Sequence, residues 1–144
     1  VKHRSNEAFL ALITKLKEKS LIFFDSINAK DFYRQNILHY AVMCGNELAL
    51  NSLIQETAIY RDRNIWIDSS DITGRTPFYK ATEIQNLNFM NKLLQADCNI
   101  NIPNSIGTRP IDLARTSENQ ELKDFFGLKK SFFNSCFAHV RVKR

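Results

Sequence analysis

The chain has 144 residues, of which 44% are hydrophobic and 11 are Phe, so it can form one domain with a substantial core. Only 4 Gly and 3 Pro argue against a long linker, and no run of apolar residues is long enough to predict a membrane span. Of the 20 basic residues, seven lie in residues 1–4 and 129–144, so residues 5–128 hold 13 basic and all 15 acidic residues, a net charge of −2. This near-neutral body argues against a nucleic-acid-binding surface, which needs a basic stripe.

The three cysteines, Cys44, Cys98 and Cys136, are far apart, odd in number and without a Cys-x-x-Cys motif. Reduced thiols and a cytoplasmic location are therefore expected. The sequence shows no basic-then-apolar signal segment at its start. Because the chain begins with Val1, we expect it to be a fragment or a processed form of a longer protein.

The N-terminal region predicts one amphipathic helix. Apolar residues recur at helical spacing from Asn6 to Lys19, with Glu7 near the start and lysines near the end, as the helix dipole favours. The apolar residues 21–24 that follow are expected to be buried.

Residues 31–70 predict a pair of helices. Asn36 can cap the first helix, and Gly45 can take the positive φ that ends it. The distance from Asp31 to Asp71 is 40 residues, seven more than the 33 from Asp71 to Asn104. The excess falls in residues 56–64, as a longer second helix or a looped insertion. Trp66 is expected to be buried against this insertion, with an exposed binding anchor as the alternative.

Residues 71–103 predict a second pair with clearer signals. Asp71 to Gly74 has the composition of a turn, Thr76 can cap a helix, and Pro77 suits its first position. Small Ala81 allows close approach of a neighbouring helix. A second helix from about Leu87 has one apolar face made by Phe89, Met90, Leu93 and Leu94.

A third pair is predicted from Asn104, with Gly107 in the turn, Pro110 at the helix start and a second helix near residues 120–126. Apolar residues in 131–144 recur at helical spacing and predict a last helix on the end of the stack.

Three stretches of these pairs resemble one another and a known family. Residues 76–81 read Thr-Pro-Phe-Tyr-Lys-Ala, residues 36–41 read Asn-Ile-Leu-His-Tyr-Ala, and residues 109–114 read Arg-Pro-Ile-Asp-Leu-Ala. They resemble the Thr-Pro-Leu-His-x-Ala signature of ankyrin repeats, units of about 33 residues. The resemblance covers about residues 26–126 and implies an all-α, ankyrin-type helix-turn-helix solenoid of about three repeats with capping helices at both ends. It divides the single domain 1–144 into N-terminal capping helices (1–30), a repeat with an insertion near 56–64 (31–70), a repeat (71–103), a capping repeat (104–128) and a C-terminal helix or tail (129–144).

No catalytic, cofactor or metal site is predicted. The ankyrin counterpart of His39 is structural, its imidazole bonding backbone groups between neighbouring turns, and Tyr79 at the equivalent place supports this role. Cys136 and His139 are spaced as a nucleophile and base might be, but no oxyanion-hole glycines or orienting acid accompany them. The scattered Cys and His residues also lack metal-ligand spacing.

The resemblance instead implies a concave face, made by turn tips and first helices, that binds a partner. Aromatic residues and Met at such places are the usual anchors of an interface, and a contiguous exposed apolar patch marks an interaction site. The alternatives are that tails or the insertion cover this face, or that some of these residues belong to the core. The predicted partner-binding residues are Phe32, Tyr33, Gln35, Met43, Ile72, Thr73, Arg75, Glu83, Ile84 and Ile106.

The resulting hypothesis is a monomeric, non-enzymatic module that binds another protein, with Arg34 and Arg75 as charged rim contacts. One alternative is a substrate-recruiting domain of a larger enzyme. Another is binding of a polyanion, nucleic acid or acidic lipid, through the basic ends. The abundance of Asn, Ile, Lys and Phe suggests an AT-rich genome, and by analogy with ankyrin-type effectors of intracellular bacteria and viruses a host-directed partner is conceivable.

Overall fold

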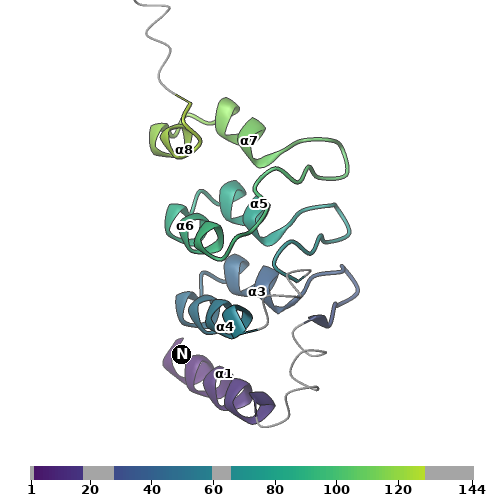
Figure 1. Ribbon diagram of the computed structural model, residues 1–144, viewed down its shortest axis with the longest axis vertical. Helices are drawn as coiled ribbons and strands as arrows, with labels where there is room; N and C mark the ends of the chain where they lie inside the picture. Colours follow the sequence, from purple (N-terminus) through teal and green to yellow (C-terminus); the bar gives the residue numbers. More distant parts are fainter. Residues whose placement is uncertain (1, 18–27, 60–65, 129–144) are drawn as a thin grey trace, which may run out of the picture.

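The computed structural model describes residues 2–17, 28–59 and 66–128, and these residues form helices and turns without a β-strand. The described part of the chain is therefore all-α, as predicted. Its helices are α1 (Lys2–Lys17), α3 (Ile37–Met43), α4 (Glu47–Ile59), α5 (Pro77–Glu83), α6 (Leu87–Gln95), α7 (Pro110–Thr116) and α8 (Gln120–Phe125) (Figure 1).

The helices form layers of antiparallel pairs. Figure 1 shows α3 with α4, α5 with α6 and α7 with α8, each pair joined by a tight turn, while the loops between pairs extend to one side. Helices α3, α5 and α7 contact one another in that order, α4 contacts α6, and α1 lies against α4. A single pair cannot bury its own apolar face, so each layer depends on its neighbours for a core.

Capping fixes the start of each first helix. The Asn36 side-chain oxygen accepts hydrogen bonds from the backbone N–H groups of residues 38 and 39, and Thr76 Oγ1 accepts one from residue 79. Arg109 cannot act in this way. The Asp112 carboxylate instead accepts the Arg109 backbone N–H at 3.0 Å, so a residue in the first turn of α7 caps the start of that helix.

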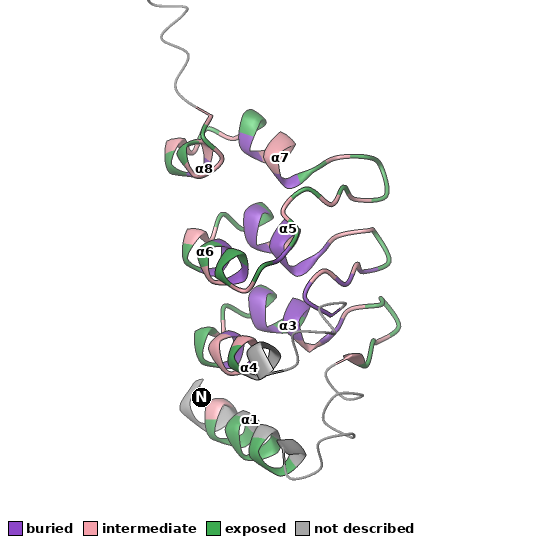
Figure 2. Cartoon of the chain, in the orientation of Figure 1, coloured by how far each residue is buried: buried purple, intermediate pink, exposed green. Residues whose placement is uncertain are grey.

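Equivalent apolar residues occupy equivalent places in successive layers. Leu38, Phe78 and Ile111 are each the second residue of a first helix, and the small residues three positions later are all buried. Leu38 and Phe78 have no exposed surface, whereas Ile111 is half-buried. Figure 2 shows α7 in the end layer, where no further described layer covers it. Phe78 also packs against two aromatic rings of the third pair, Phe125 and Phe126, each with a ring centroid 6.2 Å away.

The third pair has the properties of an end layer. Lys123 stands 33 residues after Met90, which is fully buried, but Lys123 itself is half-buried. An ammonium group at this place needs water, which suits the last layer of a stack and not an inner one.

Several sequence predictions need adjustment. Helix α1 begins at Lys2 and not at Asn6 and is described as far as Lys17, while the predicted end at Lys19 lies outside the described residues; α8 ends at Phe125. Helix α4 has 13 residues where α6 has 9, so part of the extra length of this unit is a longer second helix. Trp66 is 2% exposed, so its burial is confirmed and the exposed-anchor alternative is wrong. The predicted contact with the insertion falls largely on residues 60–65, outside the described part of the chain. The predicted burial of residues 21–24 and the predicted last helix lie outside the described residues.

Candidate functional site

The candidate surface begins with three loops that share one hydrogen-bonding pattern. Each loop opens with an Asp or Asn whose side-chain oxygen accepts the backbone N–H of the residue four positions later. These bonds measure 2.7 Å for Asp31, 2.9 Å for Asp71 and 2.9 Å for Asn104. The fourth residue of each loop has a left-handed backbone, with φ of +59° at Arg34, +78° at Gly74 and +85° at Gly107.

Neighbouring loops are bonded to each other through their backbones. The Ile72 N–H donates to the Tyr33 carbonyl at 2.8 Å, and the Ser105 N–H donates to the Thr73 carbonyl at 2.9 Å. These bonds fix the loops side by side. Residues at their tips, which are 33 or 40 positions apart in the sequence, therefore become neighbours on the surface.

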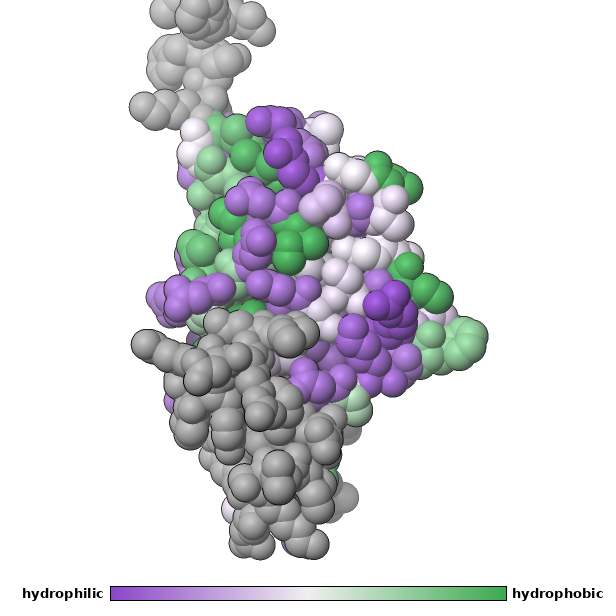
Figure 3. All heavy atoms as spheres, turned by 45° about the vertical axis from the view of Figure 1, so that its right-hand side comes forward, coloured by the Kyte–Doolittle hydropathy of each residue, from purple (hydrophilic) through white to green (hydrophobic). Residues whose placement is uncertain are grey.

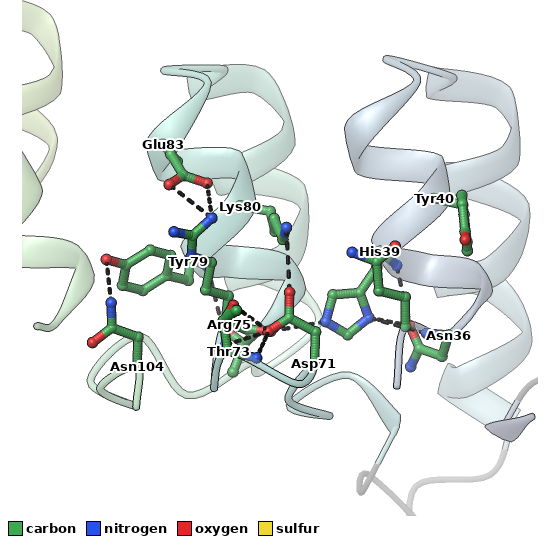
Figure 4. Close-up of polar contacts among 12 residues, drawn as sticks. Asn36, His39, Tyr40, Asp71, Thr73, Arg75, Tyr79, Lys80, Glu83 and Asn104 are labelled. Carbon is green, nitrogen blue, oxygen red and sulfur yellow. Dashed lines mark hydrogen bonds and ion pairs between the residues drawn. The ribbon is translucent and has the colours of Figure 1, made fainter. Parts of the chain in front are cut away.

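A second set of bonds joins α3 and α5 to the loop that follows each pair. His39 Nε2 donates to the Arg75 carbonyl at 2.9 Å, while its Nδ1 accepts the backbone N–H of Asn36 at 3.2 Å. Tyr79, at the equivalent place one layer on, accepts a hydrogen bond from Asn104 Nδ2 on its hydroxyl at 3.0 Å (Figure 4). His39 thus makes the bridge between turns that the sequence predicted.

The pKa of His39 predicts a loss of stability in mild acid. Burial lowers this pKa, so the folded protein resists a proton that the unfolded chain binds below about pH 6.5. Stability is then fully present well above that pH and decreases as the pH falls through it. Urea unfolding at several pH values measures the slope, and His39→Gln should flatten it. An unchanged slope in that variant would contradict this assignment.

Asp71 is the most fully bonded carboxylate of the surface. It accepts hydrogen bonds from the Thr73 backbone N–H at 2.8 Å and hydroxyl at 2.7 Å and from the Arg75 N–H at 2.9 Å, and it pairs with Lys80 at 3.2 Å (Figure 4). Burial raises the pKa of Asp71, but these donors outweigh it and lower the pKa to about 2. Its oxygens are committed to the fold and are not available as a catalytic base.

An ion pair occupies the centre of the surface, between the loops and the first helices. Arg75 Nη1 lies 3.2 Å from the Glu83 carboxylate, and its guanidinium carbon lies 6.0 Å from the ring centroid of Tyr79 (Figure 4). Both charged side chains are about one-third exposed, at 35% and 37%. The sequence predicted Arg75 and Glu83 as contact residues, and the structure brings them together.

Seven of the ten predicted binding residues lie on the three loops, and the other three lie at the C-terminal ends of α3 and α5. The loop residues among them form the tips or, for Gln35 and Arg75, the base of the loops, and Met43, Glu83 and Ile84 lie where the first helices end. Figure 3 shows hydrophobic patches on the projecting edge. The alternative that some of the apolar residues belong to the core is wrong, because all six are exposed: Phe32, Tyr33, Met43, Ile72, Ile84 and Ile106.

Tyr40 is a surface residue that the sequence prediction missed. It is exposed on α3, and its hydroxyl donates a hydrogen bond to the Asp31 carboxylate. This bond raises the pKa of Tyr40 and lowers that of Asp31. Its place in the repeat could have predicted this exposure. His39 and Ala41 on either side of it are buried against the neighbouring layers, so the Tyr40 side chain points away from them to the surface of α3.

No other chemical site emerges from the described part of the chain. It holds no group of three His, Cys, Asp or Glu residues close enough to bind a metal ion, and none of its helices is long and apolar enough to cross a membrane. Cys98 is buried, and burial raises the pKa of its thiol to about 12, so it is unreactive as a nucleophile.

Comparison with known proteins gives no family: no protein-family model matches the sequence, and no curated protein matches it significantly.

Proposed function

We propose that this chain is an ankyrin-type stack of three helix pairs that binds another protein and has no catalytic activity of its own. The binding surface is the hairpin face, defined as the three loops (31–35, 71–75 and 104–108) together with the C-terminal ends of α3 and α5. We expect the chain to act as a monomer inside a cell.

The proposed repeat architecture is supported by equivalence at several levels. The three loops share one side-chain bond and one left-handed position, and the two contacts between successive loops follow one pattern. The first helices all have seven residues and the same buried small residue. A chain with three unrelated helix pairs would have no reason to repeat these details.

The observation that carries the proposed function is the exposure of large apolar side chains at the loop tips. Phe32 is 86% exposed and Ile106 is 84% exposed, although each could be buried with a gain of about 2 kcal/mol. They lie on loops that are fixed by hydrogen bonds, so a partner finds the surface already ordered. Rigid apolar anchors of this kind are typical of protein interfaces.

The expected result of disrupting the hairpin face is loss of partner capture. The double variant Phe32→Ala, Ile72→Asp should lose the proteins that the native chain retains from a lysate, and affinity for an identified partner should fall at least about tenfold. A matched control is Leu48→Ser, Leu94→Ser, which removes two exposed leucines from the second helices. Quantitative mass spectrometry of the captured proteins compares the three forms.

Three outcomes would contradict this function. If the control loses the same proteins as the hairpin-face variant, the leucine side of the second helices binds the partner. If capture vanishes on removal of residues 129–144 and weakens steeply with salt, the basic end binds a polyanion, which was the alternative. Hydrolase activity that is sensitive to Cys136→Ser would contradict the non-enzymatic assignment.

A further inference from the structure

Arg34 is the residue of the hairpin face that the fold itself does not explain. It occupies the fourth place of its loop with φ of +59°, where the other two loops have Gly74 and Gly107. An L-residue with a side chain is strained in this region, and Gly is the residue that fits it without cost. Arg34 is exposed, and its guanidinium has no hydrogen bond or carboxylate partner among the described residues.

Two other non-Gly residues of the described chain have a positive φ, and the fold explains each of them. Gln85, with φ of +57°, accepts a hydrogen bond from Asn119 Nδ2 at 2.9 Å and so joins the second pair to the third. Asp97, with φ of +61°, is of a type that tolerates this conformation because its short polar side chain can bond locally. Arg34 makes no such internal side-chain bond and is not a residue type that tolerates this conformation, so we expect its side chain to contact another molecule.

The surroundings of Arg34 define what it could contact. Lys30, also exposed, directly precedes the same loop and has no carboxylate partner among the described residues either. Asp31 lies between them, but its oxygens are occupied by Tyr40 and by a backbone N–H. That carboxylate keeps its negative charge, so this segment carries two positive charges and one negative charge, a net charge of +1. This charge lies directly beside two exposed aromatic rings, Phe32 and Tyr33, which meet edge to face at 5.5 Å.

The rest of the hairpin face is neutral by comparison. Arg75 is paired with Glu83, and Lys80 is paired with Asp71. The neighbouring tips, Ile72 and Ile106, are aliphatic and offer no aromatic face on which a base could stack. One cationic end followed by an apolar row does not match the continuous negative charge of a nucleic acid, but it does match a polypeptide with localised acidic charge.

We propose that the hairpin face binds an acidic, apolar segment of its partner protein, and that Arg34 selects it by contacting a carboxylate beside an apolar anchor. The anchor lies against Phe32 and Tyr33, and further apolar residues of the same segment lie along Ile72 and Ile106. This inference rests on the proposed function and adds the chemistry of the partner to it.

A first test needs no ligand. Arg34→Gly should raise the melting temperature by about 2–4 °C, because it removes the strain and no described internal contact of the side chain. Lys123→Gln, which removes a positive charge from α8, is the matched charge control and should leave the melting temperature within about 1 °C. A lower melting temperature for Arg34→Gly would show that Arg34 supports the fold and would overturn the inference.

The second test selects peptides from a randomised twelve-residue library displayed on phage. The native chain should enrich peptides in which Asp or Glu lies next to aromatic or aliphatic residues, and Arg34→Gly should lose the acidic bias. A synthetic peptide of the enriched type should bind Arg34→Gly at least about tenfold more weakly than the native chain or Lys123→Gln. Fluorescence anisotropy measures these affinities.

The outcomes separate this inference from the proposed function. If the selection enriches apolar peptides without acidic residues, or enriches no peptide at all, the inference of an acidic partner segment is overturned. The capture of proteins from a lysate then decides the proposed function. If the native chain and the double variant Phe32→Ala, Ile72→Asp enrich the same peptides equally, both the acidic partner segment and the proposed binding surface are overturned. Binding of polyuridylate RNA that depends on Arg34, without peptide binding, overturns both in favour of a nucleic-acid ligand.

Discussion

Replacing Gly74 with Ala lowers the free energy of unfolding by about 3 kcal/mol, whereas the same change at Gly107 costs about 1 kcal/mol. Both glycines have positive φ, +78° and +85°, so the backbone strain of an added Cβ is similar at the two positions. Only at Gly74 does that Cβ meet the next loop, 2.5 Å from the backbone nitrogen of Ser105 and 2.9 Å from the carbonyl carbon of Asn104. Backbone atoms cannot move aside without breaking the loop-to-loop hydrogen bond.

Urea denaturation of the two variants measures the difference, and Gly107→Ala serves as the control for strain because its Cβ meets nothing within 4 Å. Gly74→Ala should also weaken partner binding, since the three tips would no longer lie in one row. Equal costs at the two positions would mean that the loops do not stack as described, and the hairpin face would lose its structural basis.

Much of this stack could be predicted because its signals are local. Thr76 and Pro77 define a helix start by chemistry that involves only adjacent residues, and Gly45 defines a helix end in the same way. Equal spacing then predicts that Phe78 and Ile111 occupy matching places. The cap at Arg109 could not be read in this way, because the usual capping residue is absent and Asp112 provides the bond instead.

The candidate site was predicted less completely because exposure depends on contacts that are distant in the sequence. The alignment of the units predicted that the apolar tips lie on one side of the stack. The alternative that some of them belong to the core could be excluded only from their exposure in the structure. The strain at Arg34 is invisible in the sequence, since an Arg aligned with two glycines could equally have marked a differently shaped loop. The φ of +59° at Arg34 shows that this loop has the same left-handed backbone as the other two loops, although the residue at that place is not Gly.

Replacing Asp71 with Ala should destabilise the protein by about 3 kcal/mol, and Asp71→Asn should cost only about 1 kcal/mol. Asp71 is 4% exposed and accepts three hydrogen bonds that shape the second loop, and the same residue neutralises Lys80. Asn keeps an acceptor oxygen. The third loop shows that this suffices, because the Asn104 amide oxygen accepts the N–H groups of Ile106 and Thr108. The difference between the two variants isolates the loop bonds from the charge pair.

The low pKa of Asp71 adds a dependence on acid that only the native residue can show. The folded value of about 2 lies below the ordinary Asp value near 3.9, so the unfolded chain binds a proton first as the pH falls. The contribution of Asp71 is therefore fully present above about pH 4 and is lost between about pH 4 and 2, to a total of about 2 kcal/mol. Other carboxylates with lowered pKa values, such as Asp112, are present in both proteins, so the comparison with Asp71→Asn cancels their contributions.

The stability difference between native protein and Asp71→Asn should therefore narrow as the pH is lowered, and chemical denaturation at pH values between 5 and about 2.5 measures it. His39, whose contribution begins to be lost near pH 6.5, is present in both proteins, so the comparison cancels its effect as well. A difference that stays constant through the acid range would mean that Asp71 has an ordinary pKa, and that the bonds from Thr73 and Lys80 form in a geometry too weak to hold the second loop.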